Sequence, residues 1–105
     1  MEKEHLSSAQ QFTEERFTKI DIMKRRTSSA FLLNFLPEQH MRPHAHPNRE
    51  LYLHVLEGSG TLFVDDEEVY VNQGDDIFCN PEEEIGFTNT SDENVTMYGV
   101  MTKMT

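Results

Sequence analysis

Short apolar runs with a period of two dominate this chain from Phe17 onward. The stretch "ELYLHVL", for example, places Leu51, Leu53 and Val55 on one face and polar residues on the other. Turn-forming residues separate such runs about every ten residues, which predicts roughly eight or nine short strands. No segment in this region has the periodicity of a helix of about three turns. The pattern predicts an all-β, antiparallel sandwich or barrel.

The chain divides into a short polar extension and one domain. With 105 residues it is long enough for a single modest core. Residues 1–16 are polar, and a capping box at Ser8 and Gln11 predicts a short helix there. An arm that exchanges with a partner chain is the alternative for the extension. Residues 17–105 are predicted to form the barrel domain.

Charge and cysteine usage exclude several classes of function. The formal net charge is -10, which argues against nucleic acids and anionic membranes as partners. It also disfavours an anionic substrate, unless the site is locally basic. The single cysteine, Cys79, permits no internal disulfide and fits a reducing compartment. The start of the chain resembles no secretory signal, and no apolar run is long enough to span a bilayer, so we expect a cytoplasmic protein.

Histidines gather in the stretch "HMRPHAHPNRELYLHVL". Pro43 and Pro47 exclude a helix interior here, and in an extended chain His44 and His46 project to the same side. Glu50 returns to that side if the intervening turn keeps the phase. Two imidazoles and a carboxylate are ligand types of divalent transition metals, with Fe, Mn, Zn, Ni and Cu all open. A pair of polar histidines on an exposed strand is the simpler alternative.

These residues resemble a known family. The segments "HAHPNRE…GSG" and "GDDIFCNPEEEIGFTN" are similar to the two sequence motifs of the cupins, small barrels of the double-stranded β-helix or jelly-roll type. The resemblance covers most of residues 29–102 and is strongest to compact single-domain cupins of bacteria. Cupins usually hold a metal with three histidines and a glutamate. By position, the resemblance implies that His44, His46 and Glu50 are ligands.

The chain also departs from the cupin pattern. Ile85 stands where the second motif has its histidine, so the implied site lacks one ligand. Seven residues, not the family's six, separate Glu50 from Gly58. Either the strand bulges near Leu51, or Leu51 occupies the ligand slot and Glu50 is out of phase. Three side chains are candidates to complete the site: His40, Glu84 and Cys79.

Two main functions follow as expectations. The first is divalent-metal binding at a degenerate site inside the barrel, formed by His44, His46 and Glu50 with help from His40; its reaction, if it is an enzyme, is left open. The alternative is a metal-free cupin that binds a small molecule or acts as a sensor. Six side chains suit an aromatic or apolar pocket for such a ligand: Phe31, Leu33, Phe35, Phe63, Phe78 and Phe87. A homodimer is expected in either case, because small barrels commonly pair their edge strands.

Overall fold

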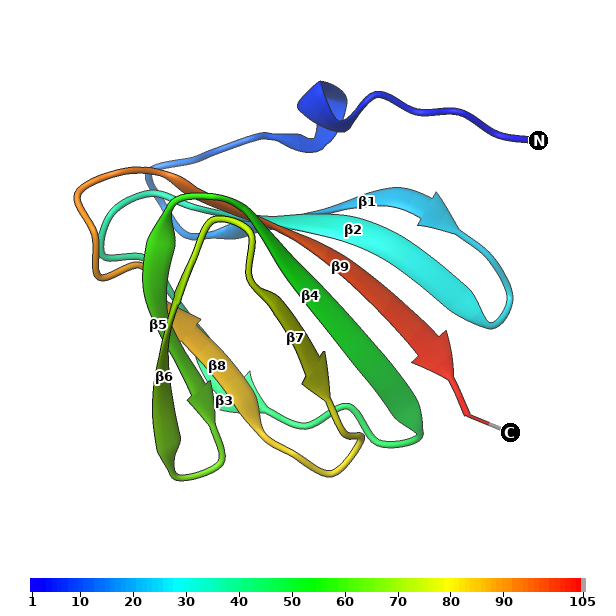
Figure 1. Cartoon of the computed structure of the whole chain (residues 1–105). Coiled ribbons are helices and arrows are strands. Elements are labelled where there is room, and N and C mark those ends of the chain that lie inside the picture. The colour runs from blue at the N-terminus through cyan, green and yellow to red at the C-terminus, as the bar shows by residue number, and fades with distance from the viewer. Residues whose placement is uncertain (105) are drawn as a thin grey trace.

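The computed structural model describes residues 1–104 as a barrel of two antiparallel sheets (Figure 1). One sheet has the strand order β1-β2-β9-β4-β7, and the other has the order β3-β8-β5-β6. The strands are β1 (Thr18–Lys24), β2 (Ser28–Phe35), β3 (His40–His44), β4 (Arg49–Glu57), β5 (Ser59–Val64), β6 (Glu67–Asn72), β7 (Asp76–Cys79), β8 (Ile85–Thr88) and β9 (Val95–Lys103). The all-β, antiparallel prediction is therefore confirmed.

The inner face of the five-stranded sheet consists of rows of side chains set by strand register. Lys19, Leu33, Met97 and Val55 are successive partners across β1, β2, β9 and β4. Because side chains of a strand alternate between faces, every second residue along these strands points into the barrel. The β1–β2 hairpin extends beyond the four-stranded sheet, so the inner face is uncovered at that end (Figure 1).

Apolar side chains from both sheets fill the closed end of the barrel. Phe35 and Phe87 are 0% exposed, and their ring centroids lie 4.8 Å apart. Phe17 also stacks on Phe35, with ring centroids 5.1 Å apart. The closed end is a packed core, whereas the opposite end is lined by polar and charged residues.

The polar extension lies against the outer face of the five-stranded sheet. It contains a 3-10 helix, Leu6–Ala9, which begins two residues before the capping box that the sequence indicated. The buried amide of Asn34 donates to the carbonyl oxygen of Ala9 at 2.8 Å and accepts from the hydroxyl of Thr96 at 3.0 Å. These bonds tie the extension to the barrel of its own chain. No helix among residues 1–104 is both long and apolar enough to cross a bilayer.

A turn and a strand irregularity lie where the chain departs from the glycines that the cupin resemblance implies: Glu38 stands six residues before His44, where the first motif has a glycine, and Gly58 comes one residue late. Glu38 has φ of 72° at the position where the cupin motif has glycine. The turn thus keeps the left-handed conformation although a glutamate, which adopts it less easily, supplies it. The extra residue before Gly58 is absorbed by an irregularity between Val55 and Glu57, where β4 shifts register against β9. The bulge therefore lies near Leu56 rather than near Leu51.

Candidate ligand pocket of the barrel

A cavity of about 340 Å³ opens at the uncovered end of the barrel. We call it the barrel pocket. Its walls come from β1, β2, β3, β4 and β9 and from the segments just before β1 and just after β3. Twelve residues line it: Arg16, Phe17, Lys19, Phe31, Leu33, Met41, His44, His46, Arg49, Leu51, Leu53 and Met101. Its volume lies within the range of about 300–1,000 Å³ that is usual for small-molecule sites.

The floor of the pocket is apolar and depends on one glycine. A Cβ atom at Gly99 would lie 2.4 Å from atoms of the Phe31 ring, so the missing side chain makes room for that ring. Gly99 is the cross-strand partner of both Phe31 and Leu53. Lys19 Nζ lies 4.7 Å from the centroid of the Phe31 ring, a cation–π contact that places the ammonium group over the floor.

His44 and His46 form one wall of the pocket. Their ring centroids are 4.5 Å apart, which confirms that the two side chains project to the same side. Nδ1 of His44 lies 2.8 Å from the carbonyl oxygen of Arg42 and donates to it, because that oxygen can only accept. The other ring nitrogen, Nε2, is then left for a ligand.

The charged side chains of the barrel pocket are all cations. Arg16, Lys19 and Arg49 line it, and no carboxylate of the described chain does. The pKa of His46 is lowered by burial first, and then by His44, Lys19 and Arg49. Proximity to positive charge thus disfavours a further cation at this wall. The pocket is suited to an anion, although the chain as a whole carries a formal charge of -10.

The other two predicted ligands, Glu50 and His40, do not join the histidine pair. Leu51 is 4% exposed and lines the pocket, so strand alternation places Glu50 on the outer face of β4. Of the two registers that the sequence left open for this strand, the structure has the one in which Leu51 occupies the ligand slot and Glu50 is out of phase. His40 is exposed at the start of β3, opposite Thr88, and does not line the pocket.

The residues considered as replacements for the missing ligand are also placed elsewhere. Ile85 is the direct cross-strand partner of His44 but is a 0% exposed core residue. Cys79 is buried in the same core, and burial, with a smaller contribution from Glu83, raises the pKa of its thiol to about 11. Glu84 is exposed, and its backbone N–H donates to Asp65. None of these side chains lines the barrel pocket.

A fully coordinated metal ion of the cupin type does not fit this set of residues. Two of the four ligand positions hold the hydrocarbon side chains of Leu51 and Ile85, which offer no electron pair. Across residues 1–104, no three side chains of His, Cys, Asp or Glu are grouped so that they could hold a metal ion. Whether His44 and His46 hold a metal by themselves stays a prediction.

The predicted aromatic lining is correct in part. Phe31 and Leu33 line the pocket, while Phe35 and Phe87 form the core beneath it. Phe78 instead lies on the outer face, 44% exposed, and its ring packs against that of Tyr52 in a tilted arrangement, with ring centroids 5.1 Å apart. Phe63 is also absent from the lining, since Leu62 takes the inward position in β5. The pocket also contains four residues that no sequence motif indicated: the cations Arg16, Lys19 and Arg49 and the ring of Phe17.

Together the fold and pocket define a small β-barrel with a ligand-sized cavity. The Cupin domain family matches residues 31–101. The chain therefore belongs to the cupin family, and the resemblance seen in the two motifs is confirmed.

Solved structures share this fold at low sequence identity. A protein from Thermus thermophilus has a TM-score of 0.91 and 23% identity, with 100% of both chains covered. An uncharacterized Klebsiella pneumoniae protein with a double-stranded β-helix domain has a TM-score of 0.92 and 14% identity, with 98% of this chain and 90% of that chain covered. An RmlC-like cupin protein from Desulfovibrio desulfuricans has a TM-score of 0.85 and 21% identity, with 97% and 96% covered. At identities below 25%, these similarities show the fold alone. No curated protein matches the chain.

Proposed function

We propose that this protein is a small-molecule-binding cupin whose barrel pocket takes an organic anion with an apolar, ring-sized body. One observation carries the proposal: the pocket is apolar at its floor and lined by cations without a carboxylate of the described chain, in a protein of net charge -10. The apolar body would lie on Phe31 and Leu53, and a carboxylate at its end would reach Lys19 and Arg49. Arg side chains are well suited to this role because the guanidinium binds carboxylates in a fork geometry.

The histidine pair also supports an anionic ligand in the barrel pocket. Because the pKa of His46 is lowered, its imidazole is neutral near pH 7 and can donate one N–H without adding charge to the pocket. His44 is oriented by its bond to the carbonyl oxygen of Arg42. His46 would therefore serve as a hydrogen-bond donor that orients the ligand, while His44 is held in a fixed orientation beside it.

Three probes with one shared body test the proposal: hydrocinnamate, its amide and phenylpropylamine. Calorimetric titration is expected to show hydrocinnamate binding about 30-fold more tightly than the amide, because a charged head group at two cations is worth about 2 kcal/mol here. The amine should show no binding, since its charge repels Lys19 and Arg49. Equal affinity for acid and amide, or tighter binding of the amine, would rule the proposal out.

Metal binding at His44 and His46 is the second candidate function. The 4.5 Å separation of the two rings supports it, because one ion can bridge imidazoles at that spacing, whereas the charges of Lys19 and Arg49 oppose a cation at the same wall. With only two protein ligands we expect added zinc to bind weakly and to be removed by dialysis against a chelator. When present, the ion would supply Lewis acidity at this wall.

Zinc titration of the His44→Ala, His46→Ala double variant checks that assignment. The variant is expected to lose zinc binding and to keep its β-sheet circular dichroism, because both side chains lie at the pocket wall rather than in the core. The matched control is His5→Ala with His54→Ala, which removes two histidines outside the pocket. Retained zinc in the pocket variant would show that the ligands lie elsewhere. Stoichiometric metal that resists the chelator would instead favour the metal site over the anion site.

The homodimer expected from the sequence stays a prediction. Light scattering coupled to size-exclusion chromatography tests it, with a mass of about twice the 12.2 kDa chain expected.

A further inference from the structure

A second hollow adjoins the barrel pocket at the uncovered end of the five-stranded sheet. This outer basin has a volume of about 150 Å³ and shares Lys19, Arg49 and Met101 with the barrel pocket. The two hollows are therefore one continuous surface, apolar at the inner end and polar at the outer end. The lining of the outer basin comes largely from the β1–β2 hairpin, together with Arg49 of β4 and Met101 and Lys103 of β9.

Positive charge is concentrated at this end of the molecule. Six cations line the outer basin: Lys19, Lys24, Arg25, Arg26, Arg49 and Lys103. With Arg16 in the barrel pocket, seven of the chain's nine Lys and Arg residues line one hollow or the other. By contrast, Asp21 is the one acidic residue of the described chain in the basin, 4.0 Å from Lys19. A local positive field within an acidic protein attracts anions to this place and repels them elsewhere.

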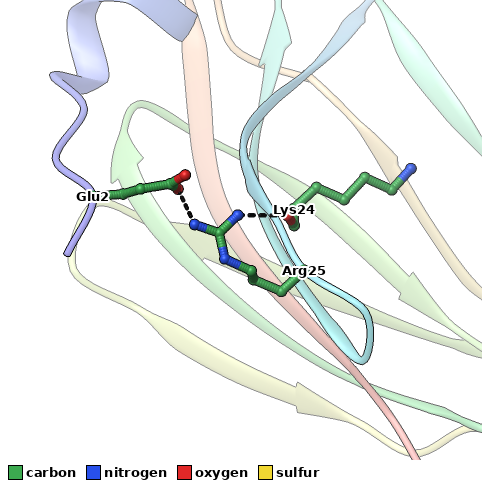
Figure 2. Close-up of polar contacts among 3 residues, drawn as sticks. All are labelled: Glu2, Lys24 and Arg25. Carbon is green, nitrogen blue, oxygen red and sulfur yellow. Dashed lines mark hydrogen bonds and ion pairs between the residues drawn. The ribbon is translucent and has the colours of Figure 1, made fainter.

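Arg25 already engages a carboxylate. Its guanidinium forms an ion pair with Glu2 of the extension and donates to the carbonyl oxygen of Lys24 at 2.8 Å (Figure 2). Glu2 raises the pKa of Arg25, first by accepting a hydrogen bond from the guanidinium and then through its negative charge. Both side chains of the pair are about half exposed, so the pair contributes little to stability and a more highly charged anion can displace it.

We infer that the outer basin binds a phosphate group, and that the ligand of this protein is an amphipathic organic phosphate whose apolar body lies in the barrel pocket. The inference rests on the proposed function and names its ligand class. Six cations exceed what one carboxylate requires, whereas a phosphate monoester carries a charge of about -1.5 to -2 near pH 7 and three strong acceptor oxygens. The small, concave basin suits one such group.

Paired titrations with hydrocinnamate and phenylpropyl phosphate test this inference. The phosphate ester is expected to bind about tenfold more tightly than the carboxylate, because its second charge adds contacts in the basin. In the Arg26→Gln, Lys103→Gln double variant this advantage should fall to less than about threefold, with hydrocinnamate affinity nearly unchanged. The matched control is Lys3→Gln with Arg42→Gln, which removes the two cations outside both hollows and should change neither affinity.

The outcomes separate the two proposals. If hydrocinnamate binds but the ester is no tighter, the phosphate inference fails and the proposed function stands. If the Arg26→Gln, Lys103→Gln variant binds both ligands more weakly by the same factor, the basin acts only through its overall positive potential and not by binding the phosphate group. That result also overturns the inference. Inorganic phosphate alone should bind at least about 30-fold more weakly than the ester, since it lacks the apolar body. Equal affinity for inorganic phosphate and the ester would overturn the inference, because the basin would then be a site for free phosphate. Binding of no probe would overturn both proposals.

Discussion

Replacement of Phe35 by alanine is expected to lower the free energy of unfolding by about 4 kcal/mol, the largest stability effect of any single change considered for this chain. Phe35 is 0% exposed and its ring packs against those of Phe17 and Phe87, at centroid distances of 5.1 and 4.8 Å. Truncation removes the buried area of the ring and leaves a cavity that the two sheets cannot close without shifting. For a domain of this size the melting temperature should fall by about 20 °C.

Phe78→Ala is the matched control for this substitution. The chemical change is the same, but Phe78 is 44% exposed on the outer face and contacts Tyr52 rather than the core. We expect a loss of about 1 kcal/mol or less. Chemical denaturation of both variants checks the pair. A loss below about 1.5 kcal/mol for Phe35→Ala, or equal losses for the two, would mean that the closed end of the barrel is not the main core.

Removal of the two cations that the barrel pocket shares with the basin is expected to have the largest effect on binding. In the Lys19→Gln, Arg49→Gln variant, hydrocinnamate affinity should fall about 30-fold, because both hydrogen-bonding charges next to the carboxylate are lost. The side chain of Lys19 is 49% exposed and lies 4.0 Å from an aspartate, so its loss should change stability by no more than about 0.5 kcal/mol.

The Lys3→Gln, Arg42→Gln variant is again the control, since it makes the same change in net charge away from the pocket. It should bind hydrocinnamate as the unaltered protein does. Calorimetry gives the affinities, and thermal unfolding shows that each variant is folded. A similar loss in both variants would indicate that net charge alone controls affinity. Unchanged hydrocinnamate affinity in both variants would show that Lys19 and Arg49 do not bind the carboxylate.

The strands and family were predictable because alternation and turn residues report on local structure. "ELYLHVL" already placed Leu51, Leu53 and Val55 on one face, and all three are buried in the structure. The two cupin motifs were recognisable despite Ile85 and Glu38, because the turns and strand spacing survive both changes. Glu38 keeps the left-handed turn without a glycine.

The site was harder to predict, because it depends on register and on contacts between distant segments. Sequence spacing left two phases open for Glu50, and the irregularity between Val55 and Glu57 decides between them. The stretch "FTKIDIM" also alternates, but alternation alone does not show which of its two faces points inward. In the structure Ile20 and Ile22 lie beside the extension at an outer hollow, while Lys19 faces the pocket. The cluster of cations thus becomes visible only when β1, β4 and β9 are brought together.

Binding of an organic anion in the barrel pocket can be observed residue by residue in the amide NMR spectrum of the protein during titration with hydrocinnamate. We expect the largest shifts on pocket residues, foremost Lys19, Phe31, His46 and Arg49, and we expect these shifts to saturate together. Shifts centred instead on the exposed Tyr52–Phe78 face, or a spectrum unchanged by the ligand, would rule out anion binding in the barrel pocket.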